Sequence, residues 1–249
     1  MGIIIKSADE IKLMREVGRI VARVLEALAR EVKPGIKTYE LDALAAEELK
    51  RHGAVSSDRG YRGFPANICT SVNEEVVHGI PGNRVLQEGD IISLDITANR
   101  KGFHGDAAIT LGVGKISPLA QKLIEATRGA LEAGIAVARA GVHLSDISYA
   151  IQSYVEARGF SPVREYVGHG IGREMHEEPP IPNFGPPGKG PILRQGMTLA
   201  LEPMISAGDW KTKVLPDRWT VVTADGSLSA HFEHTIAITD GEAEILTQA

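Results

Sequence analysis

The chain has 249 residues, of which 43% are hydrophobic and 24% are charged, and it has a single cysteine, Cys69. That length fits one large domain or two small ones, and a lone cysteine excludes an intrachain disulfide framework. The 32 acidic and 27 basic residues give a net charge of -5, which disfavours a nucleic-acid-coating protein or a polybasic membrane protein. No segment approaches a signal-peptide core or a membrane span, so we expect a cytoplasmic protein.

Four helices are predicted in two pairs, and each pair is followed by strands. Apolar residues recur at helical spacing in each of these segments, and Gly or Pro follows their ends. The predicted helices run from a capping box at residues 7–10 to just before Pro34, over 38–52, over 118–138 and over 144–158. Strands and hairpins are predicted over 76–111, and again after Tyr166.

This order of elements indicates an internal repeat. Residues 25–53 align with residues 131–159, which places Gly35 on Gly141 and Gly53 on Gly159. Residues 86–95 then align with residues 193–202 almost in the same register, which superposes Asp95 on Glu202. The alignment predicts two related halves, about 1–112 and 113–249.

Four acidic residues on predicted strands are candidate metal ligands. Asp95 and Asp106 flank the segment 99–102, and a hairpin loop there would place the two carboxylates directly opposite each other, with Cβ atoms about 5 Å apart. Glu202 and Glu233 point away from their apolar neighbours on strands of the second half. If all four converge, metal is required to compensate their charge. Solvated surface acids remain the alternative reading of the hairpin, because acids are common on exposed antiparallel sheets.

One of the eight histidines, His169, has the surroundings of a metal ligand. It lies in a Gly-His-Gly-Ile-Gly segment, whose glycines let the backbone approach an ion closely. A phosphate-binding loop is disfavoured, because this segment opens no predicted helix and no dinucleotide or Walker pattern follows. Oxygen ligands with one imidazole suit Mn, Fe(II), Co or Zn in an open catalytic centre. His104 and His231 flank candidate ligands and are expected to lie behind them or in solvent.

Seven short motifs resemble, in order, those of type I methionine aminopeptidases. They are VHGIP at 77–81, SLD at 93–95, GD at 105–106, GHGIG at 168–172, MHE at 175–177, LEP at 201–203 and SAHFEHT at 229–235. The resemblance covers nearly the whole chain. It implies the α+β pita-bread fold, in which two pseudo-twofold-related halves form a curved antiparallel sheet covered by helices, here as a single catalytic domain over 1–249.

The resemblance also implies a role for each matching residue. The implied ligands of a dinuclear centre of Co, Mn, Fe(II) or Zn are Asp95, Asp106, His169, Glu202 and Glu233, with Asp106 and Glu233 bridging the ions. Glu202 would be the general base, and His78 and His176 would contact the scissile bond. Residues matching the methionine pocket are Tyr61, Phe64, Cys69, Met175 and Trp219, although an aromatic residue is common in the family at position 175. Asn73, Glu75 and Ser229 match a monovalent cation site of some members.

The implied activity is removal of the initiator methionine from nascent chains whose second residue is small. The enzyme would be a monomer, and its partners would be the N-termini of nascent chains at the ribosome. The short segment between Glu202 and Glu233 leaves no room for the insert of type II enzymes, and the single cysteine argues against a zinc-binding leader, so a bacterial-type enzyme is expected. Three alternatives stay open: an X-Pro aminopeptidase or prolidase, a non-catalytic binding module, and a metal-independent hydrolase of the creatinase type.

Overall fold

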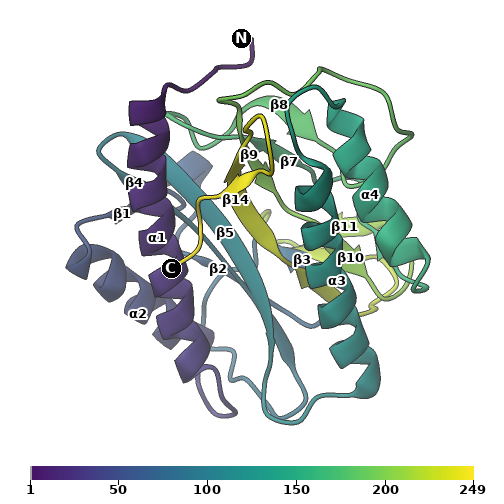
Figure 1. The fold of residues 1–249 in the computed structure, drawn as a ribbon. Helices are drawn as coiled ribbons and strands as arrows, with labels where there is room; N and C mark the ends of the chain where they lie inside the picture. The colour runs from purple at the N-terminus through teal and green to yellow at the C-terminus, as the bar shows by residue number, and fades with distance from the viewer. Residues whose placement is uncertain (1) are drawn as a thin grey trace.

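A nine-stranded antiparallel sheet joins both ends of the sequence in the computed structural model, which describes residues 2–249 (Figure 1). The main path runs β1–β4–β5–β14–β9–β7–β8, with β2 added on β4 and β15 on β14. The strands are β1 (Val55–Ser56), β2 (Cys69–Val72), β4 (Ile91–Arg100), β5 (Phe103–Gly112), β7 (Gly168–Gly170), β8 (Glu177–Ile181), β9 (Thr198–Leu201), β14 (Glu233–Ala237) and β15 (Glu244–Ile245). The two halves of the chain meet where β5 pairs with β14.

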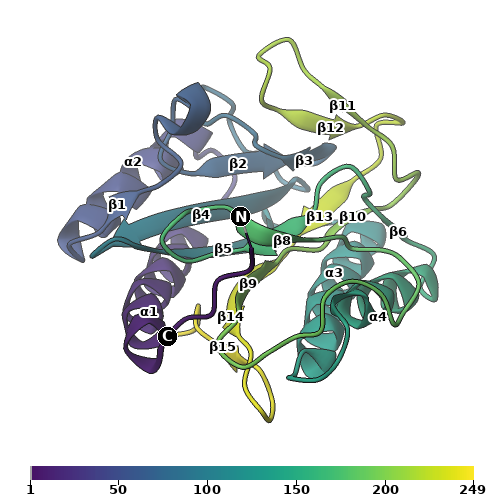
Figure 2. The ribbon, with the colours of Figure 1, turned by 90° about the horizontal axis from the view of Figure 1, so that it is seen from above.

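Two small three-stranded sheets complete the β structure. One has the order β13 (Ser229–His231), β10 (Met204–Ser206) and β6 (Ser161–Pro162). The other has the order β11 (Thr212–Val214), β12 (Val221–Thr223) and β3 (Glu75–Val77). Figure 2 shows β3, β11 and β12 on one side of β4 and β5, while α1, α3 and α4 lie on the opposite side.

The four predicted helices are confirmed to within two residues at each end. They are α1 (Ala8–Glu31), α2 (Thr38–Arg51), α3 (Pro118–Val137) and α4 (Leu144–Glu156). The capping box of α1 forms as predicted, because the Ser7 hydroxyl accepts from the Glu10 backbone and the Glu10 carboxylate accepts from the Ser7 backbone. One short 3₁₀ helix, η1 (Tyr61–Gly63), is not predicted by any periodicity in the sequence. Among residues 2–249, no helix combines the length and apolar character needed to cross a membrane.

Apolar and polar side chains alternate along the central strands, so one face of the sheet packs against helices and the other face is polar. Ile92, Leu94 and Ile96 of β4 are buried in one apolar cluster with residues of α1 and α2. Leu199, Leu201 and Ile236 are buried in a second cluster with residues of α3 and α4. Since side chains alternate across a strand, the intervening residues of β4, β5, β9 and β14 all point to the opposite face.

The two halves repeat the same backbone contacts before these strands. The Gly35 N–H donates to the Leu86 carbonyl at 2.8 Å, and the Gly141 N–H donates to the Leu193 carbonyl at 2.9 Å. Gly35 and Gly141 both have φ above +90°, a conformation that favours glycine. The aligned residues therefore occupy matching places.

The predicted register of the β4–β5 hairpin is wrong by two residues. Asp95 pairs with Ala108, and Asp106 pairs with Thr97, so the two aspartates lie diagonally rather than opposite each other. The ladder extends to the pair of Arg100 with Phe103, which leaves only two residues in the turn. Both turn residues, at 101 and 102, have positive φ, as a two-residue turn that matches the strand twist requires. Because the shift is an even number of residues, both carboxylates stay on the same face.

Candidate metal centre and substrate cavity

One row of side chains crosses four strands on the polar face of the large sheet. Cys69 of β2 pairs with Asp95 of β4, Asp95 pairs with Ala108 of β5, and Ala108 pairs with Glu233 of β14. Paired residues in adjacent antiparallel strands point to the same face. Asp95 and Glu233 are therefore brought together above the small side chain of Ala108, although they are distant in sequence.

Asp106 and His169 enter the same face from the neighbouring positions. Asp106 is two residues before Ala108, and its backbone N–H donates to the Thr235 hydroxyl at 3.0 Å. His169 lies on β7 and pairs with Ala200 of β9, which in turn pairs with Thr235. The β-strand around His169 explains why its flanking glycines are needed, since a Cβ at position 168 or 170 would overlap a carbonyl oxygen of β9 or β8.

Glu202 completes the cluster directly after β9. The His169 Nε2 atom lies 3.4 Å from Glu202 Oε1 and 3.8 Å from Asp106 Oδ2. One ligand atom from each of Asp106, His169 and Glu233 lies within 4.8 Å of the others. Asp95 borders the same cavity as these residues, so all five candidate ligands face one space; they come from β4, β5, β7, β14 and the segment after β9.

The unsatisfied polar atoms of this cluster fit a bound cation. Asp106 Oδ1 and Glu233 Oε1 are buried and have no hydrogen-bond partner among residues 2–249. Buried polar atoms are normally paired, because leaving them unpaired costs the lost solvation. Carboxylate oxygens and one imidazole are suitable donors for a first-row divalent ion. The donor set therefore fits divalent metal.

The carboxyl groups also disfavour each other's ionisation when no cation lies between them. Burial, followed by repulsion from Asp106, raises the pKa of Asp95, Glu202 and Glu233 well above the ordinary carboxyl range. Burial raises the pKa of Asp106 to about 6. Divalent cations would reverse this effect, because an opposite charge nearby favours the ionised form.

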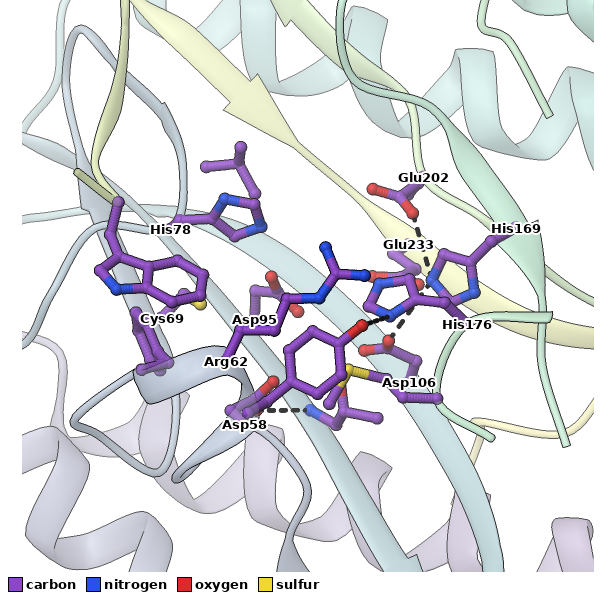
Figure 3. A pocket seen from close by; sticks show the side chains of 16 residues that line it. Asp58, Arg62, Cys69, His78, Asp95, Asp106, His169, His176, Glu202 and Glu233 are labelled. Carbon is purple, nitrogen blue, oxygen red and sulfur yellow. Dashed lines mark hydrogen bonds and ion pairs between the residues drawn. The ribbon is translucent and has the colours of Figure 1, made fainter. Parts of the chain in front are cut away.

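The cluster forms the floor of a cavity of about 350 Å³ (Figure 3). Every residue that the resemblance assigned to catalysis, to metal or to the methionine pocket lines this cavity. The lining residues are Asp58, Tyr61, Arg62, Phe64, Cys69, Val77, His78, Asp95, Thr97, Asp106, His169, Met175, His176, Glu202, Trp219 and Glu233. The tertiary structure therefore gathers residues from both halves around one space.

His78 and His176 stand above the acidic floor. The His176 Nδ1 atom lies 3.0 Å from the Tyr61 hydroxyl, and the His176 ring centroid lies 4.4 Å from that of His169. His78 has its ring edge-on to Trp219, at 6.0 Å between centroids. Burial lowers the pKa of both His78 and His176 to about 4. Both rings are therefore neutral at pH 7 and can donate one hydrogen bond and accept another.

An apolar wall lies beside these polar groups. Phe64, Cys69 and Ala66 form a small buried cluster, and Trp219 packs against it. The Phe64 and Trp219 rings meet edge to face at 5.1 Å between centroids. Met175 is also buried on the cavity wall. Such a surface can hold an apolar side chain while the acidic floor holds charge.

Four lining residues were missed by sequence reasoning: Asp58, Arg62, Val77 and Thr97. Thr97 follows from strand alternation, since it shares the face of Asp95. Val77 does not follow from it, because neighbouring residues of a strand point to opposite faces; β3 ends at Val77, and His78 departs from the strand conformation with φ of 60°. Asp58 and Arg62 lie in or beside the irregular segment around η1, where no periodicity predicts direction. Arg62 has φ of 47°, which is unusual for a residue other than glycine.

The remaining candidates lie outside the cavity lining. His104 bonds Ser57 and Asn99, each at 2.9 Å, and His231 is buried with its Nε2 atom 3.8 Å from Glu233 Oε2. The Ser229 N–H donates to the Asn73 carbonyl at 2.8 Å, so two of the three predicted cation-site residues are adjacent. The third, Glu75, accepts from the Val72 N–H and from Arg84 through its side chain.

A family model for metallopeptidase family M24 matches residues 12–240. The chain therefore belongs to metallopeptidase family M24, and its fold and its cluster of Asp106, His169 and Glu233 indicate the use of divalent metal.

Similarity over the full length identifies the group within this family to which the chain is related. It is 56% identical over 246 residues to methionine aminopeptidase 1 of Bacillus subtilis, covering 99% of each sequence. The crystal structure of methionine aminopeptidase from Thermotoga maritima covers 100% of both chains, with a TM-score of 0.98 and 47% identity. Within family M24 the chain is one of the bacterial-type methionine aminopeptidases, which are metal-dependent hydrolases. The prediction from the motifs is confirmed, as is the pita-bread fold.

The prolidase from Pyrococcus horikoshii shares the fold at greater distance. It has a TM-score of 0.79 and 21% identity, and the match covers 99% of this chain but 64% of that one. This likeness concerns the fold alone.

Proposed function

We propose that the enzyme hydrolyses the first peptide bond of polypeptides that begin with methionine and a small second residue. The observation that carries this proposal is the single cavity that joins an acidic floor, two neutral histidines and an apolar wall. The floor offers donors for divalent metal, and the wall suits a flexible apolar side chain such as methionine. His176 lies against His169 of the floor, and His78 lies against Trp219 of the wall.

We assign two divalent ions to the floor, held by the five ligands that the resemblance implies. Asp106 and Glu233 would bridge the ions, Asp95 would bind one of them, and His169 and Glu202 would bind the other. Bound divalent ions supply a lowered pKa for the attacking water and an electrophile for the carbonyl oxygen. Co, Mn, Fe(II) and Zn all suit this donor set, and the availability of each metal in the cell decides which one is bound. A monovalent cation near Asn73, Glu75 and Ser229 remains a further expectation.

The protein's own groups then manage protons and orientation. Glu202 would accept the proton of the attacking water; the position of its carboxylate, 3.4 Å from His169 Nε2, supports this role. Glu202 would return that proton to the leaving amine. His78 and His176, neutral at pH 7, would hydrogen-bond the scissile carbonyl and amide and stabilise the charge that develops during attack.

The apolar wall would hold the methionine side chain. Tyr61, Phe64, Cys69 and Trp219 match family positions for this pocket, and Met175 supplies a flexible thioether where an aromatic is common. A flexible side chain at this place would let the pocket adjust to its ligand.

The same proposal covers the enzyme's partners, location and organisation. Nascent chain N-termini, presented at the ribosome in the cytoplasm, are the expected substrates of a monomeric enzyme. We also infer that residues 1–249 act as one catalytic domain, because the proposed ligands come from both halves of the chain.

Cleavage of a Met-Gly-Ala peptide by metal-reconstituted enzyme tests the proposal. We expect Glu202→Gln to lower kcat by at least 100-fold, within the range that general bases contribute. Glu156→Gln, at the exposed end of α4, is the matched control and should retain activity. An Ala-Pro peptide cleaved faster than Met-Gly-Ala would favour the prolidase alternative. Activity that survives chelation would contradict a metal-dependent mechanism.

A further inference from the structure

A buried ion pair joins the start of the chain to the loop that carries His176. The Lys6 ammonium contacts the Glu177 carboxylate, and the two side chains are only 3% and 4% exposed. Lys6 Nζ also donates to the Ile4 carbonyl at 3.3 Å, and the Lys6 backbone N–H donates to the Gly196 carbonyl at 2.8 Å. Lys6 is therefore anchored through both its backbone and its side chain.

Glu177 uses its second oxygen to hold the loop before it. Its Oε1 atom accepts from the Arg173 N–H at 2.9 Å and from the Glu174 N–H at 3.3 Å. Gly172 lies against the pair so closely that a Cβ there would overlap Lys6 Cε and lie 2.6 Å from Glu177 Oε1. One carboxylate thus joins the N-terminal segment to the backbone of residues 172–177.

This loop presents two residues to the cavity. Met175 is buried on the cavity wall, and His176, which directly precedes Glu177, contacts Tyr61 and the His169 ring. The loop between β7 and β8 has no regular structure, and the backbone bonds of residues 172–176 join Gly172 to Glu174 at 3.1 Å and Gly172 to His104 at 2.8 Å, on the side away from residues 175 and 176 in sequence. The bonds that Glu177 accepts therefore help to define where residues 175 and 176 lie.

Burial of both charges is costly, and stability alone does not account for it. Taking two charges out of water costs several kcal/mol per ion, which their attraction repays only with good geometry. A second long-range pair, Arg15 with Glu244, joins α1 to the C-terminal segment while its side chains stay 33% and 35% exposed. Anchoring the N-terminal region therefore does not require a desolvated pair.

We propose that Lys6 and Glu177 are positioning residues that hold the loop 172–177 so that His176 and Met175 face the substrate. The first residues of the chain are thereby part of the active-site structure. The effect on catalysis rests on the proposed function, because it requires His176 to act on the substrate.

A double-mutant cycle tests this coupling. We expect Lys6→Met, which leaves the Glu177 carboxylate buried without its counter-charge, to lower kcat/KM by about 10- to 100-fold, as misplacement of catalytic groups does. In the His176→Ala background, Lys6→Met should lower kcat/KM by less than about threefold, because the group that it positions is already gone. The proposal would be overturned if the effects of Lys6→Met and His176→Ala on kcat/KM were independent, so that the double variant showed their product. A wild-type kcat/KM in Lys6→Met would also overturn it.

Arg15→Met is the matched control. It breaks another long-range pair of the N-terminal region, one that does not involve residues 172–177, so it should lower the melting temperature while leaving kcat/KM within about twofold of wild type. If Lys6→Met does not fold, the double variant Lys6→Met/Glu177→Gln, which carries no buried charge, replaces it in the cycle with the same expectations.

A second readout separates this proposal from the proposed function. NMR of protein labelled with ¹⁵N-histidine reports the ring environment of His176, assigned through His176→Ala, without any turnover. We expect Lys6→Met to shift the His176 ring signals and Arg15→Met to leave them unchanged. Unshifted signals in Lys6→Met would overturn the positioning role, whereas an inactive wild-type enzyme would overturn the proposed function alone.

Discussion

Asp95 and Glu233 occupy one row of the large sheet, because each of them pairs with Ala108 on the strand between them. Adjacent strands are about 4.8 Å apart, so the two backbones lie about 10 Å from each other. The space between the carboxylates exists because the central residue ends at Cβ. We therefore expect the proposed metal site to require a small residue at position 108.

Replacement of Ala108 by Leu should fill this space. We expect Ala108→Leu to lose metal binding and activity, measured by elemental analysis and peptide cleavage, and to lose about 1–3 kcal/mol of unfolding free energy through overpacking. Ala108→Ser adds one polar atom and should retain metal. Normal metal content in Ala108→Leu would contradict the location of the site above this residue.

The metal-free protein should become less stable as pH rises above 6.5. Burial and mutual repulsion raise the pKa of Asp95, Glu202 and Glu233, so the stability that these groups contribute is present at low pH and is lost as pH rises through the raised values. The buried histidines oppose this trend only below pH 6.5. Burial lowers the pKa of these histidines, to about 4 for His169. The stability that they contribute is therefore lost only at low pH and is fully present above the ordinary histidine pKa of about 6.5.

Calorimetry with and without Mn²⁺ at pH 6.5 and 8.5 measures this effect. Bound metal should remove the pH dependence and add about 3–4 kcal/mol of stability at an ion concentration of 100 to 1,000 times Kd. A melting temperature of the metal-free protein that stays constant or rises over this interval would show that the carboxyl groups do not repel one another.

Removal of the Tyr61 hydroxyl should impair catalysis with little change in stability. It lies 3.0 Å from His176 Nδ1, and an intramolecular hydrogen bond contributes about 1 kcal/mol, which corresponds to about fivefold in rate. We expect Tyr61→Phe to lower kcat for a Met-Gly-Ala peptide by that factor. Tyr39→Phe, on the exposed start of α2, is the control. Equal rates for Tyr61→Phe and wild type would mean that this bond does not orient His176.

Gly18 gives a case in which helix propensity and tertiary structure predict opposite effects. Alanine stabilises a helix interior by about 1 kcal/mol relative to glycine, and Gly18 lies inside α1. However, a Cβ at this position would overlap the Leu246 carbonyl oxygen. We therefore expect Gly18→Ala to lower the unfolding free energy by about 1–3 kcal/mol in urea denaturation. A stabilised variant would show that the C-terminal segment can move away from α1.

Local patterns in the sequence were enough to predict the four helices and the face to which each acidic residue points. Helix periodicity, caps and strand alternation depend on neighbours a few residues away, so they can be read without the fold. The motifs were sufficient to identify the family. The same motifs contain Asp95, Asp106, His169, Glu202 and Glu233, so the candidate ligands follow from the sequence without the fold.

Only the tertiary structure decided how these residues meet. The hairpin register depended on a two-residue turn with positive φ at both positions, and the sequence around 99–102 allowed a longer loop. Three further features join segments that are distant in the chain. They are the row from Cys69 to Glu233, the cavity lining by Asp58 and Arg62, and the burial of Lys6 against Glu177. Such contacts depend on strand order and packing between the two halves, which no local pattern of side chains encodes.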